Sequence, residues 1–462
     1  MRPPIGATLQ TVDTFQSVKI LEQLGDGGQG TVYRVAWNGE IKALKWYHDY
    51  AFDVYQKDSN GSFIRDSHGN KVLDTAETEK AKKLFYDNLI NNVNRGSPAP
   101  QFLWPQAVTE RSHNSFGYIM DIRPKGYVEL SQLLLGKRVR FASYRTRVDG
   151  MLNLVNAFRI FHNKGFCYQD LNDGNFFFNP DTGAVLICDN DNAAYEDYKT
   201  GVVGKCRFMA PEVVRGQKLP DTMTDRFSMA VILYFMLFRS HPLEGMVSTP
   251  TCLTPSKEIE IYGTNPIFVF DPDNKTNRPV QGVADHSIRI WNRTPQYVRD
   301  AFIRSFSKSV MTYDEDTRQY PANRLTEKEW IDILTHFRNA IIPCPNPDCP
   351  REEFFTGKRK CSKCGTLLPF TSGIQLARYK VPVCPGTQIY RIQLGPCADA
   401  QALDAVAAVI SNGDQLDLQN ISQEVWQCRT SNGTNRELPP GGTLPAKAGI
   451  QVNLSNGGFT IV

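Results

Sequence analysis

One short stretch of the chain carries the residue types that metal-assisted phosphoryl transfer needs. Asp170 and Asn175 stand five residues apart in FCYQDLNDGNFFFNP, and an apolar run follows them directly. Another acid, Asp189, ends the next apolar run, VLIC. Carboxylate and amide oxygens can hold Mg²⁺, and a positioned carboxylate can accept the proton of an attacking hydroxyl. The spacing therefore predicts a loop and a following strand that bring a metal ion and a hydroxyl nucleophile together.

Asp189 and Asp191, two residues apart, also predict a cation nearby. Neighbouring carboxylates without a counter-charge repel each other, so the sequence DND indicates a cation site rather than core packing. Asp189 is the first choice for a metal ligand, and Asp191 is the less favoured alternative.

A glycine-rich stretch near the N-terminus, LGDGGQGTVYRV, predicts a hairpin that binds phosphate. Glycines let backbone N–H groups approach phosphate oxygens without hindrance from a Cβ atom. The stretch precedes a strand rather than opening a helix, which argues against a dinucleotide-binding fold. A lysine that ends the next apolar strand, in EIKALKWY, can reach the α- and β-phosphates. The residues assigned to nucleotide contact are Gly25, Gly27, Gly28, Gly30, Val32, Ala43 and Lys45.

Lys45 needs a carboxylate partner, which we expect on the helix that follows. The interpretation is open between Glu79 and Asp87, with Glu77 less favoured. Positions 79, 83 and 87 lie on one helical face at four-residue spacing. Asp87 stands at a suitable distance before the next strand but has a shorter side chain than a glutamate.

The elements around these residues can be read from periodicity. Alternation from Val18 to Ala43 predicts twisted antiparallel strands, and the polar segment Ala51–Asp74 predicts a surface insertion. Ala76–Val93 and Tyr144–His162 have the periodicity of amphipathic helices. The run Met229–Phe238 is too short to span a membrane and predicts a buried helix.

Four cysteines form one tight group, CPNPDC followed by CSKC. Four thiolates at this spacing suit tetrahedral Zn²⁺ in a closed, structural site, with a disulfide pair or chance clustering as the alternative. The segment 341–370 strongly resembles a zinc ribbon. The zinc ligands are predicted to be Cys344, Cys349, Cys361 and Cys364.

Three motifs together resemble a known family. YQDLNDGN matches H-R-D-L-x-x-x-N, DND stands where the family has D-F-G, and Ala210-Pro211-Glu212 is an intact A-P-E motif. From about residue 15 to 338 the chain is similar to Hanks-type, or eukaryotic-like, protein kinases. The resemblance implies an α+β bilobal fold, with a β-rich N-lobe at 15–122 and a helical C-lobe at 123–338. It also implies an ATP- and Mg²⁺-dependent Ser/Thr protein kinase.

The resemblance assigns roles to individual residues. Asp170 would orient the attacking hydroxyl, while Asn175 and Asp189 would hold Mg²⁺ against the nucleotide phosphates. Met120 would lie at the back of the adenine pocket, with Asp121–Arg123 as the hinge, so that both Asp121 and Arg123 are assigned to cofactor binding.

Two further matches are structural. Asp225 stands where the family has an aspartate that braces the catalytic loop from below. Arg324 resembles the arginine that pairs with the glutamate of A-P-E, here Glu212.

Three departures from the family pattern bear on activity. Gln169 replaces the arginine that a phosphorylated activation loop neutralises, which predicts a non-RD kinase independent of that switch. Asn172 replaces the lysine that contacts the γ-phosphate, and Lys205 is placed to restore the charge. Asn190 replaces phenylalanine and predicts a weaker anchor for Asp189. The alternative is a pseudokinase or scaffold that binds nucleotide and recruits partners through the ribbon and the tail.

The tail, 372–462, has the short apolar runs and Gly, Asn and Pro turns of a small all-β domain. It faintly resembles forkhead-associated-like domains but lacks their Ser-x-x-His pattern. The whole arrangement resembles bacterial kinases encoded with von Willebrand-type and phosphatase partners in tellurite-resistance and stress clusters. These relatives imply protein substrates and autophosphorylation.

Charge and composition exclude some classes of partner. A net charge of +4 over 462 residues gives no reason to expect a nucleic-acid or membrane surface. The N-terminus shows no secretory signal pattern, so a cytoplasmic protein is the expectation.

Overall fold

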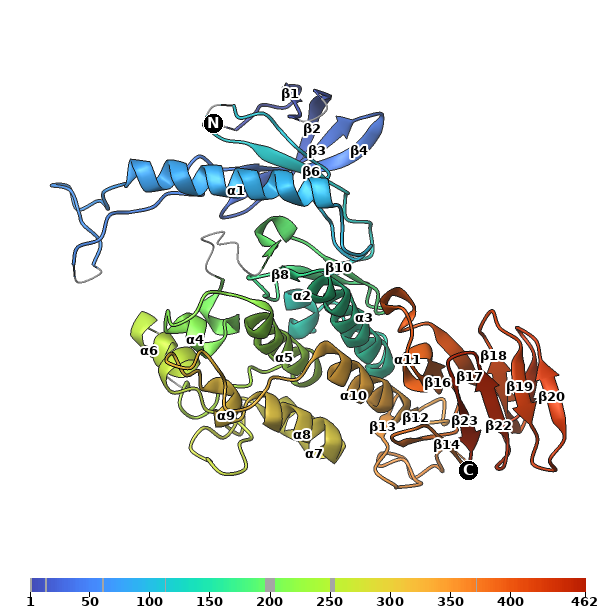
Figure 1. Cartoon of the computed structure of the whole chain (residues 1–462). Coiled ribbons are helices and arrows are strands. Elements are labelled where there is room, and N and C mark those ends of the chain that lie inside the picture. Colours follow the sequence, from blue (N-terminus) through green and yellow to red (C-terminus); the bar gives the residue numbers. More distant parts are fainter. Residues whose placement is uncertain are drawn as a thin grey trace.

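The computed structural model describes residues 2–12, 15–59, 62–112, 114–195, 204–249, 254–370 and 372–462. Along the chain, a sheet-rich lobe is followed by a helical lobe, a cysteine-bearing hairpin and a β-rich C-terminal part (Figure 1). The two lobes meet at the segments that carry Asp170 and Asp189. Among the described residues, no helix is both long and apolar enough to cross a membrane.

The N-terminal lobe is built on one six-stranded sheet with the order β1-β2-β3-β4-β6-β5. The predicted alternation from Val18 to Ala43 is confirmed as antiparallel pairing of β2, β3 and β4. The long helix α1 (Thr75–Arg95) lies against this sheet, as Figure 1 shows, and confirms the helix predicted there. The strands are β1 (Thr8–Gln10), β2 (Ser17–Asp26), β3 (Gly30–Trp37), β4 (Glu40–Tyr47), β5 (Ala107–Val108) and β6 (Gly117–Met120).

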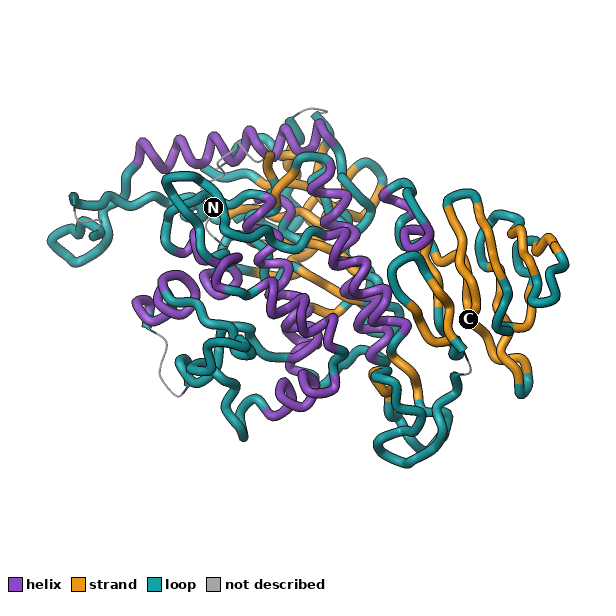
Figure 2. Tube along the Cα trace, turned by 60° about the horizontal axis from the view of Figure 1, so that its bottom comes forward, coloured by secondary structure: helices purple, strands orange, loops and turns teal. Residues whose placement is uncertain are grey.

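The predicted surface insertion before α1 is a projecting arm (Figure 2). Three short segments bond to one another in a closed cycle. The N–H of Gln56 donates to the carbonyl of Val72 at 2.9 Å, that of Val72 to Ile64 at 3.0 Å, and that of Ile64 to Gln56 at 3.0 Å. These hydrogen bonds hold the three segments of the arm to one another.

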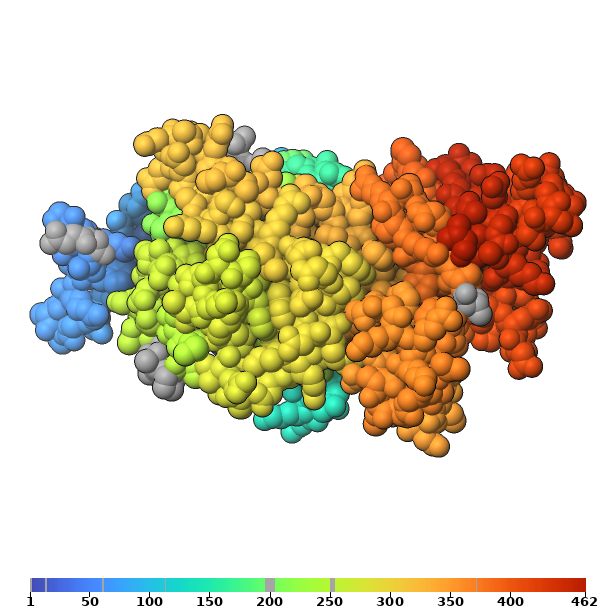
Figure 3. Space-filling model, turned by 90° about the horizontal axis from the view of Figure 1, so that it is seen from below, coloured from blue at the N-terminus to red at the C-terminus, as the bar shows by residue number. Residues whose placement is uncertain are grey.

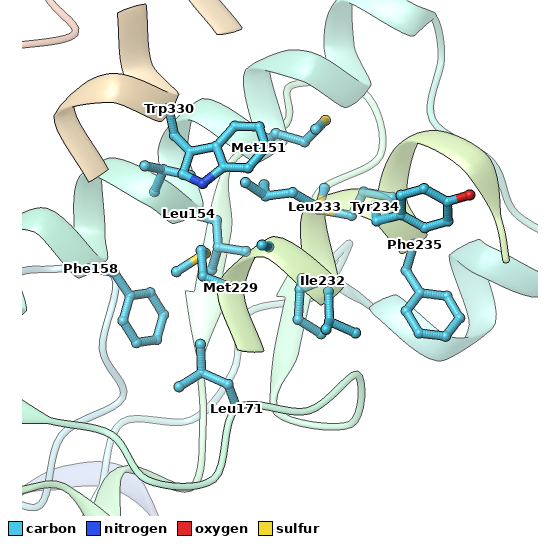
Figure 4. Packing of buried hydrophobic residues seen from close by; sticks show 14 of the residues in the cluster. Met151, Leu154, Phe158, Leu171, Met229, Ile232, Leu233, Tyr234, Phe235 and Trp330 are labelled. Carbon is cyan, nitrogen blue, oxygen red and sulfur yellow. The ribbon is translucent and has the colours of Figure 1, made fainter. Parts of the chain in front are cut away.

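The helical lobe is organised around α5 (Thr222–Phe238), which Asp221 starts with a capping box and which is apolar on nearly all sides. The expected buried helix at Met229–Phe238 is confirmed, since all ten residues are buried. Figure 4 shows Met229 and Ile232 of α5 packed beside Leu154 of α3 and Trp330 of α10. The helices are α2 (Leu130–Leu135), α3 (Tyr144–Asn163), α4 (Pro211–Val214), α6 (Pro255–Ile259), η3 (Glu260–Thr264), α7 (Asp285–Arg293), α8 (Gln296–Ser305), α9 (Lys308–Met311) and α10 (Glu327–Asn339).

Short strands at the junction of the lobes carry the catalytic segments. One three-stranded sheet has the order β10-β9-β7, and β8 pairs with β11. These strands are β7 (Val128–Glu129), β8 (Phe166–Cys167), β9 (Phe176–Phe178), β10 (Val185–Ile187) and β11 (Ala194–Tyr195), with the short helices η1 (Asn190–Asn192) and η2 (Cys206–Phe208).

After α10 the chain forms the hairpin β12 (Ile341–Pro343) and β13 (Glu352–Phe354), and then two antiparallel sheets around an apolar core that includes Trp426. Short helices α11 (Arg391–Leu394) and η4 (Asp399–Gln401) interrupt the strands, so the tail is β-rich rather than purely β. One sheet contains β15 (Lys380–Pro382), β14 (Gly373–Gln375), β23 (Gly457–Ile461), β22 (Gln451–Leu454), β19 (Trp426–Arg429) and β20 (Asn435–Leu438), and the other contains β16 (Gln388–Tyr390), β17 (Ala405–Asn412), β18 (Gln415–Asn420) and β21 (Thr443–Pro445).

The β-rich part docks on α3 and α10 and forms one end of the molecule, orange to red in Figure 3. Arg145 of α3 donates to the carbonyls of Ile341 and Pro385, each at 2.8 Å. Asn339 of α10 exchanges two hydrogen bonds with the backbone of Gln388, at 2.7 and 3.0 Å. Directional bonds of this kind fix the orientation of the two parts.

Candidate active site

Strand pairing brings the predicted metal-binding residues to one place. The loop with Asp170 and Asn175 leads into β9, and β10 leads out to Asp189. Because β9 and β10 pair antiparallel, with Phe176 opposite Ile187, the two ends lie side by side. The carbonyl of Asn175 accepts from the N–H of Cys188 at 2.9 Å, which ties the loop to the residue before Asp189.

Asp225, near the start of α5, braces the catalytic loop as expected. Its carboxylate accepts from the backbone N–H groups of Tyr168 at 2.6 Å and Gln169 at 3.1 Å. Gln169 has a φ of +71°, a conformation that non-glycine residues rarely adopt. The two hydrogen bonds to Asp225 hold that turn, and thereby the residue that follows it, Asp170.

His162, which the sequence reading missed, extends this brace to α10. Its Nε2 lies 3.2 Å from Asp225 and its Nδ1 lies 2.9 Å from Glu327. Burial alone would lower the pKa of His162, but hydrogen bonds to both carboxylates raise it to about 9. The sequence signal was a lone histidine on the last turn of an apolar helix, which core packing explains equally well.

Asp170 has the environment of a tuned proton acceptor. Burial raises the pKa of its carboxyl to about 6, and the charge of Asp189 also raises it, while a hydrogen bond from Asn172 lowers it. The Asn172 Nδ2 donates to Oδ1 of Asp170 at 3.1 Å, and the Asn175 Nδ2 donates to its carbonyl at 2.9 Å. A carboxyl with this pKa is mostly ionised at neutral pH and is still basic enough to accept a proton.

Lys205 lies beside Asn172, which stands where the family has a lysine. Lys205 was expected to restore that positive charge. Its Nζ donates to Oδ1 of Asn172 at 2.9 Å and lies 3.9 Å from Asp173. Its side chain is largely exposed. A flexible ammonium at this position can extend toward a group bound above Asp170.

The expected partner of Lys45 on the helix was wrong. Its Nζ lies 3.1 Å from Asp189 and 2.7 Å from Asp191, which are its ion-pair partners in the described part of the chain. Glu79 instead pairs with Lys82, and both Glu79 and Asp87 are on the exposed side of α1. Their shared helical face therefore turns away from the strand that carries Lys45.

This pairing also identifies the cation between the two aspartates. The spacing of Asp189 and Asp191 indicated a cation site, and the cation that occupies it is the ammonium group of Lys45. Burial opposes the charge on Lys45, but the two carboxylates raise its pKa above the ordinary value. Asp189 itself has a φ of +51°, an uncommon backbone conformation for a residue with a side chain.

Asn190, which replaces the apolar anchor of the family, makes polar contacts instead. Its side chain is buried, and its Nδ2 donates to the carbonyls of Leu103 at 2.9 Å and Ile187 at 2.8 Å. These hydrogen bonds fasten η1 to the strand before it and to the chain that leads into β5. A polar anchor thus takes the place of the apolar one.

The glycine-rich turn joins β2 and β3. The N–H of Gly27 donates to the carbonyl of Gly30 at 2.9 Å, and the His48 ring lies within 3.0 Å of the carbonyl of Gly27. A Cβ atom at Gly30 would clash with the carbonyl of Trp46, whereas Cβ atoms at Gly25 or Gly28 would meet no heavy atom within 4 Å. The turn therefore has free space around two of its glycines.

Apolar side chains lie behind this turn. Ala43 pairs with Met120 across β4 and β6, and Val32 packs against the same cluster.

The predicted hinge residues make charged contacts. Asp121, directly after β6, forms an ion pair with Lys42 at 2.6 Å. The Arg123 guanidinium lies 3.9 Å from the ring centre of Phe177.

The predicted structural pair in the helical lobe is confirmed. Arg324 contacts both carboxylate oxygens of Glu212 at 2.9 Å, and the Tyr320 hydroxyl donates to Oε1 at the same distance. Glu212 and Arg324 are both buried. A bidentate arginine pair in this setting fixes the segment that follows the catalytic loop.

The four clustered cysteines lie together after α10, two between β12 and β13 and two beyond β13. Their sulfur atoms are all within 4.8 Å of one another, with Cys344 and Cys364 3.5 Å apart and Cys349 and Cys361 3.8 Å apart. A tetrahedron of zinc–sulfur bonds of about 2.3 Å has edges of about 3.8 Å. The donor set therefore fits one tetrahedral metal ion.

The chain resembles known protein kinases in sequence. It is 31% identical over 102 residues to "Probable serine/threonine-protein kinase PknB" of Bifidobacterium longum, covering 21% of this chain and 14% of that protein. The chain spans only about a seventh of the length of the curated relatives that it matches.

Two solved kinase structures have low overall similarity. The autoinhibited serine kinase domain of the giant muscle protein titin is 14% identical, with a TM-score of 0.44 and coverage of 68% of this chain and 78% of that one. The Mycobacterium tuberculosis PknI kinase domain is also 14% identical, with a TM-score of 0.41 and coverage of 72% and 98%. The family model for the protein kinase domain matches residues 18–331, which is well over half of the chain. The chain therefore belongs to the protein kinase domain family.

Proposed function

We propose that the chain is an ATP- and Mg²⁺-dependent Ser/Thr protein kinase of the non-RD type. The observation that carries the proposal is the meeting of Asp170, Asn175, Asp189 and Lys45 at the junction of the two lobes. A protein that only binds partners has no use for a proton acceptor of raised pKa beside this group of oxygen ligands and an ammonium.

The donor set suits the cofactors that the family uses. Asp189 has a half-exposed side chain and so offers oxygen to a metal. Asn175, whose carbonyl accepts from the N–H of the residue before Asp189, is the proposed second ligand. Lys45 and the open backbone around Gly25 and Gly28 suit nucleotide phosphates. When bound, Mg²⁺–ATP supplies the phosphoryl group and offsets its negative charge. Asp170 orients the substrate hydroxyl and accepts its proton.

The adenine ring is proposed to lie among Val32, Ala43 and Met120, with Asp121 and Arg123 in the hinge. The apolar cluster supports this placement, because an adenine ring buries its faces against aliphatic side chains while backbone groups bind its edge.

The non-RD assignment rests on Gln169. This neutral side chain donates from Nε2 to the Cys167 sulfur at 3.4 Å, and its backbone N–H is held by Asp225. Because residue 169 is neutral, the catalytic loop lacks the arginine charge that a phosphorylated activation segment neutralises. We therefore expect activity without prior phosphorylation of that segment.

The phosphotransfer test compares wild type with Asp170→Ala and Asp189→Ala, using labelled ATP, Mg²⁺ and a generic protein substrate. Both variants should lose about 10²–10⁴-fold in rate. Asp181→Ala, on an exposed turn after β9, is the control and should label like wild type. Equal labelling by all four proteins would mean that the activity comes from elsewhere. Nucleotide binding without labelling would favour the pseudokinase or scaffold.

We further propose four units: an N-lobe at 15–122, a C-lobe at 123–338, a zinc ribbon at 341–370 and a β-domain at 372–462. Four converging sulfur atoms support one structural Zn²⁺. Cys361→Ser should remove the single zinc equivalent measured by metal analysis and lower the melting temperature. Cys384→Ser, a buried cysteine outside the four, should keep it. Retention of zinc by Cys361→Ser would contradict the site.

Protein hydroxyls, including those of the kinase itself, are the proposed substrates. Phosphatase and von Willebrand-type partners are proposed from the arrangement of a kinase followed by a cysteine-rich hairpin and a β-rich tail. Co-purification of each such partner with the full chain, and its loss when residues 372–462 are removed from the chain, would support recruitment through the tail. Recruitment that persists without the tail would contradict it.

A further inference from the structure

Lys45 is held by two carboxylates from one short segment, and these carboxylates differ in exposure. Its Nζ lies 3.1 Å from Oδ1 of Asp189 and 2.7 Å from Oδ2 of Asp191. The Asp189 side chain is 45% exposed, whereas that of Asp191 is 0% exposed. Asp189 is open to a second cation, while Asp191 is closed to any ion from solution.

Strand β4 directs a second donor to the same carboxylate. Tyr47 follows Lys45 by two residues, so both side chains leave one face of the strand. The Tyr47 hydroxyl donates to Oδ2 of Asp191. Oδ1 of Asp191 is buried and has no hydrogen-bond partner among the described residues. A buried carboxylate with one unpaired oxygen costs stability, so packing alone gives no reason for an acid at this position.

Helix α1 faces the segment that carries Asp191 with amides instead of an acid. The Asn88 Nδ2 donates to the carbonyls of Asp191 at 3.4 Å and Ala193 at 3.0 Å. The Asn92 Nδ2 donates to the carbonyl of Ala193 at 2.8 Å. Both asparagines are buried. The helix therefore fixes the backbone of the segment, and the charge for Lys45 comes from the segment itself.

We propose that Asp191 is the positioning residue for Lys45, and that it supplies the anionic anchor which protein kinases take from a glutamate on this helix. The proposal rests on the proposed function, in which Lys45 contacts nucleotide phosphates. An Asp189 oxygen that binds a metal is withdrawn from Lys45, but the enclosed Asp191 carboxylate still holds the ammonium. Lys45 then stays aligned without an ion pair to α1.

Nucleotide affinity distinguishes a protein in which Lys45 is anchored from a folded variant in which Lys45 is misaligned. Asp191→Asn keeps the size of the side chain and removes its charge. Loss of a charge-assisted bond from Lys45 to phosphate should weaken ADP binding about 10- to 100-fold. Adenosine has no phosphate, so its Kd should stay within about twofold of wild type. The matched control, Asp181→Asn on an exposed turn, should bind both ligands like wild type.

A double variant tests whether Asp191 acts through Lys45. Asp191→Asn should add no further loss to Lys45→Met, because the anchor has no lysine left to position.

Wild-type ADP affinity in Asp191→Asn would overturn the proposal. Equal losses for ADP and adenosine would also overturn it, because Asp191 would then support the whole pocket rather than Lys45. Phosphotransfer is measured separately on the same proteins. If wild type binds ADP but transfers no phosphate, the proposed function is wrong. The comparison of ADP and adenosine binding would still decide the role of Asp191.

Discussion

The support of the catalytic loop is tested most directly through the charge of His162. Its side chain is 3% exposed and lies between Asp225 at 3.2 Å and Glu327 at 2.9 Å. Burial opposes its charge, but these two carboxylates raise the pKa from 6.5 to about 9. The ring is therefore expected to be a cation at neutral pH that donates from both nitrogens.

The magnitude follows from the difference in pKa between the folded and unfolded chain. A histidine whose pKa is raised by folding stabilises the folded state fully below its unfolded pKa, and this stabilisation is lost as pH rises through the folded pKa. At about 1.4 kcal/mol per unit, the shift from 6.5 to about 9 is worth roughly 3 kcal/mol. The loss should therefore occur between pH 6.5 and about 9.

Urea unfolding of wild type and His162→Gln, followed by tryptophan fluorescence, measures this contribution at several pH values. The difference in unfolding free energy between the two proteins should shrink by roughly 3 kcal/mol across the window. His286→Gln is the control, because burial and nearby arginines lower the pKa of His286 to about 4. Its difference from wild type should be constant across the window. An equally constant difference for His162→Gln would refute the doubly bonded cation.

Two further substitutions test buried polar contacts by the same unfolding measurement. Arg324→Leu leaves the fully buried Glu212 without its cationic partner and should cost about 3–5 kcal/mol, most of which the added change Glu212→Gln should recover. If the double variant is as unstable as Arg324→Leu alone, the unpaired charge is not the cause. Asn190→Ala removes hydrogen bonds to two backbone carbonyls and should cost about 2 kcal/mol. A neutral effect would show that Asn190 is not an anchor.

Features set by local spacing could be predicted from the sequence. The strands from Val18 to Ala43 and the helix after the arm follow from side-chain periodicity, which needs no knowledge of distant residues. The loop of Asp170 and Asn175 and the four-cysteine group are recognisable because their ligands lie within a few residues of one another or in two short pairs.

The partner of Lys45 could not be predicted in this way. Helical periodicity placed Glu79 and Asp87 on one face, but it does not say which face is buried. The buried face of α1 carries Phe85, Leu89 and two asparagines instead. The acids that do reach Lys45 are 144 and 146 residues away in sequence, so their contact depends on how the two lobes meet. Asp191 left one local signal, a carboxylate where the family has glycine.

The docked C-terminal part and the catalytic loop share the same two helices. Helix α3 contacts the β-rich part through Arg145 near its first turn and carries His162 at its last. Helix α10 carries Glu327 at its start and Asn339 at its end, where it bonds to Gln388. With 20 residues, α3 spans about 30 Å as a rigid rod.

Coupling between two sites requires an element with two alternative arrangements. The helices that join the tail to the catalytic loop are instead continuous and closely packed, with α3 and α10 in direct contact. The docked tail therefore adds contacts to the two helices that carry His162 and Glu327, the residues behind Asp225. Its expected effect on the kinase is to stabilise the brace beneath Asp170, and not to switch the loop between states.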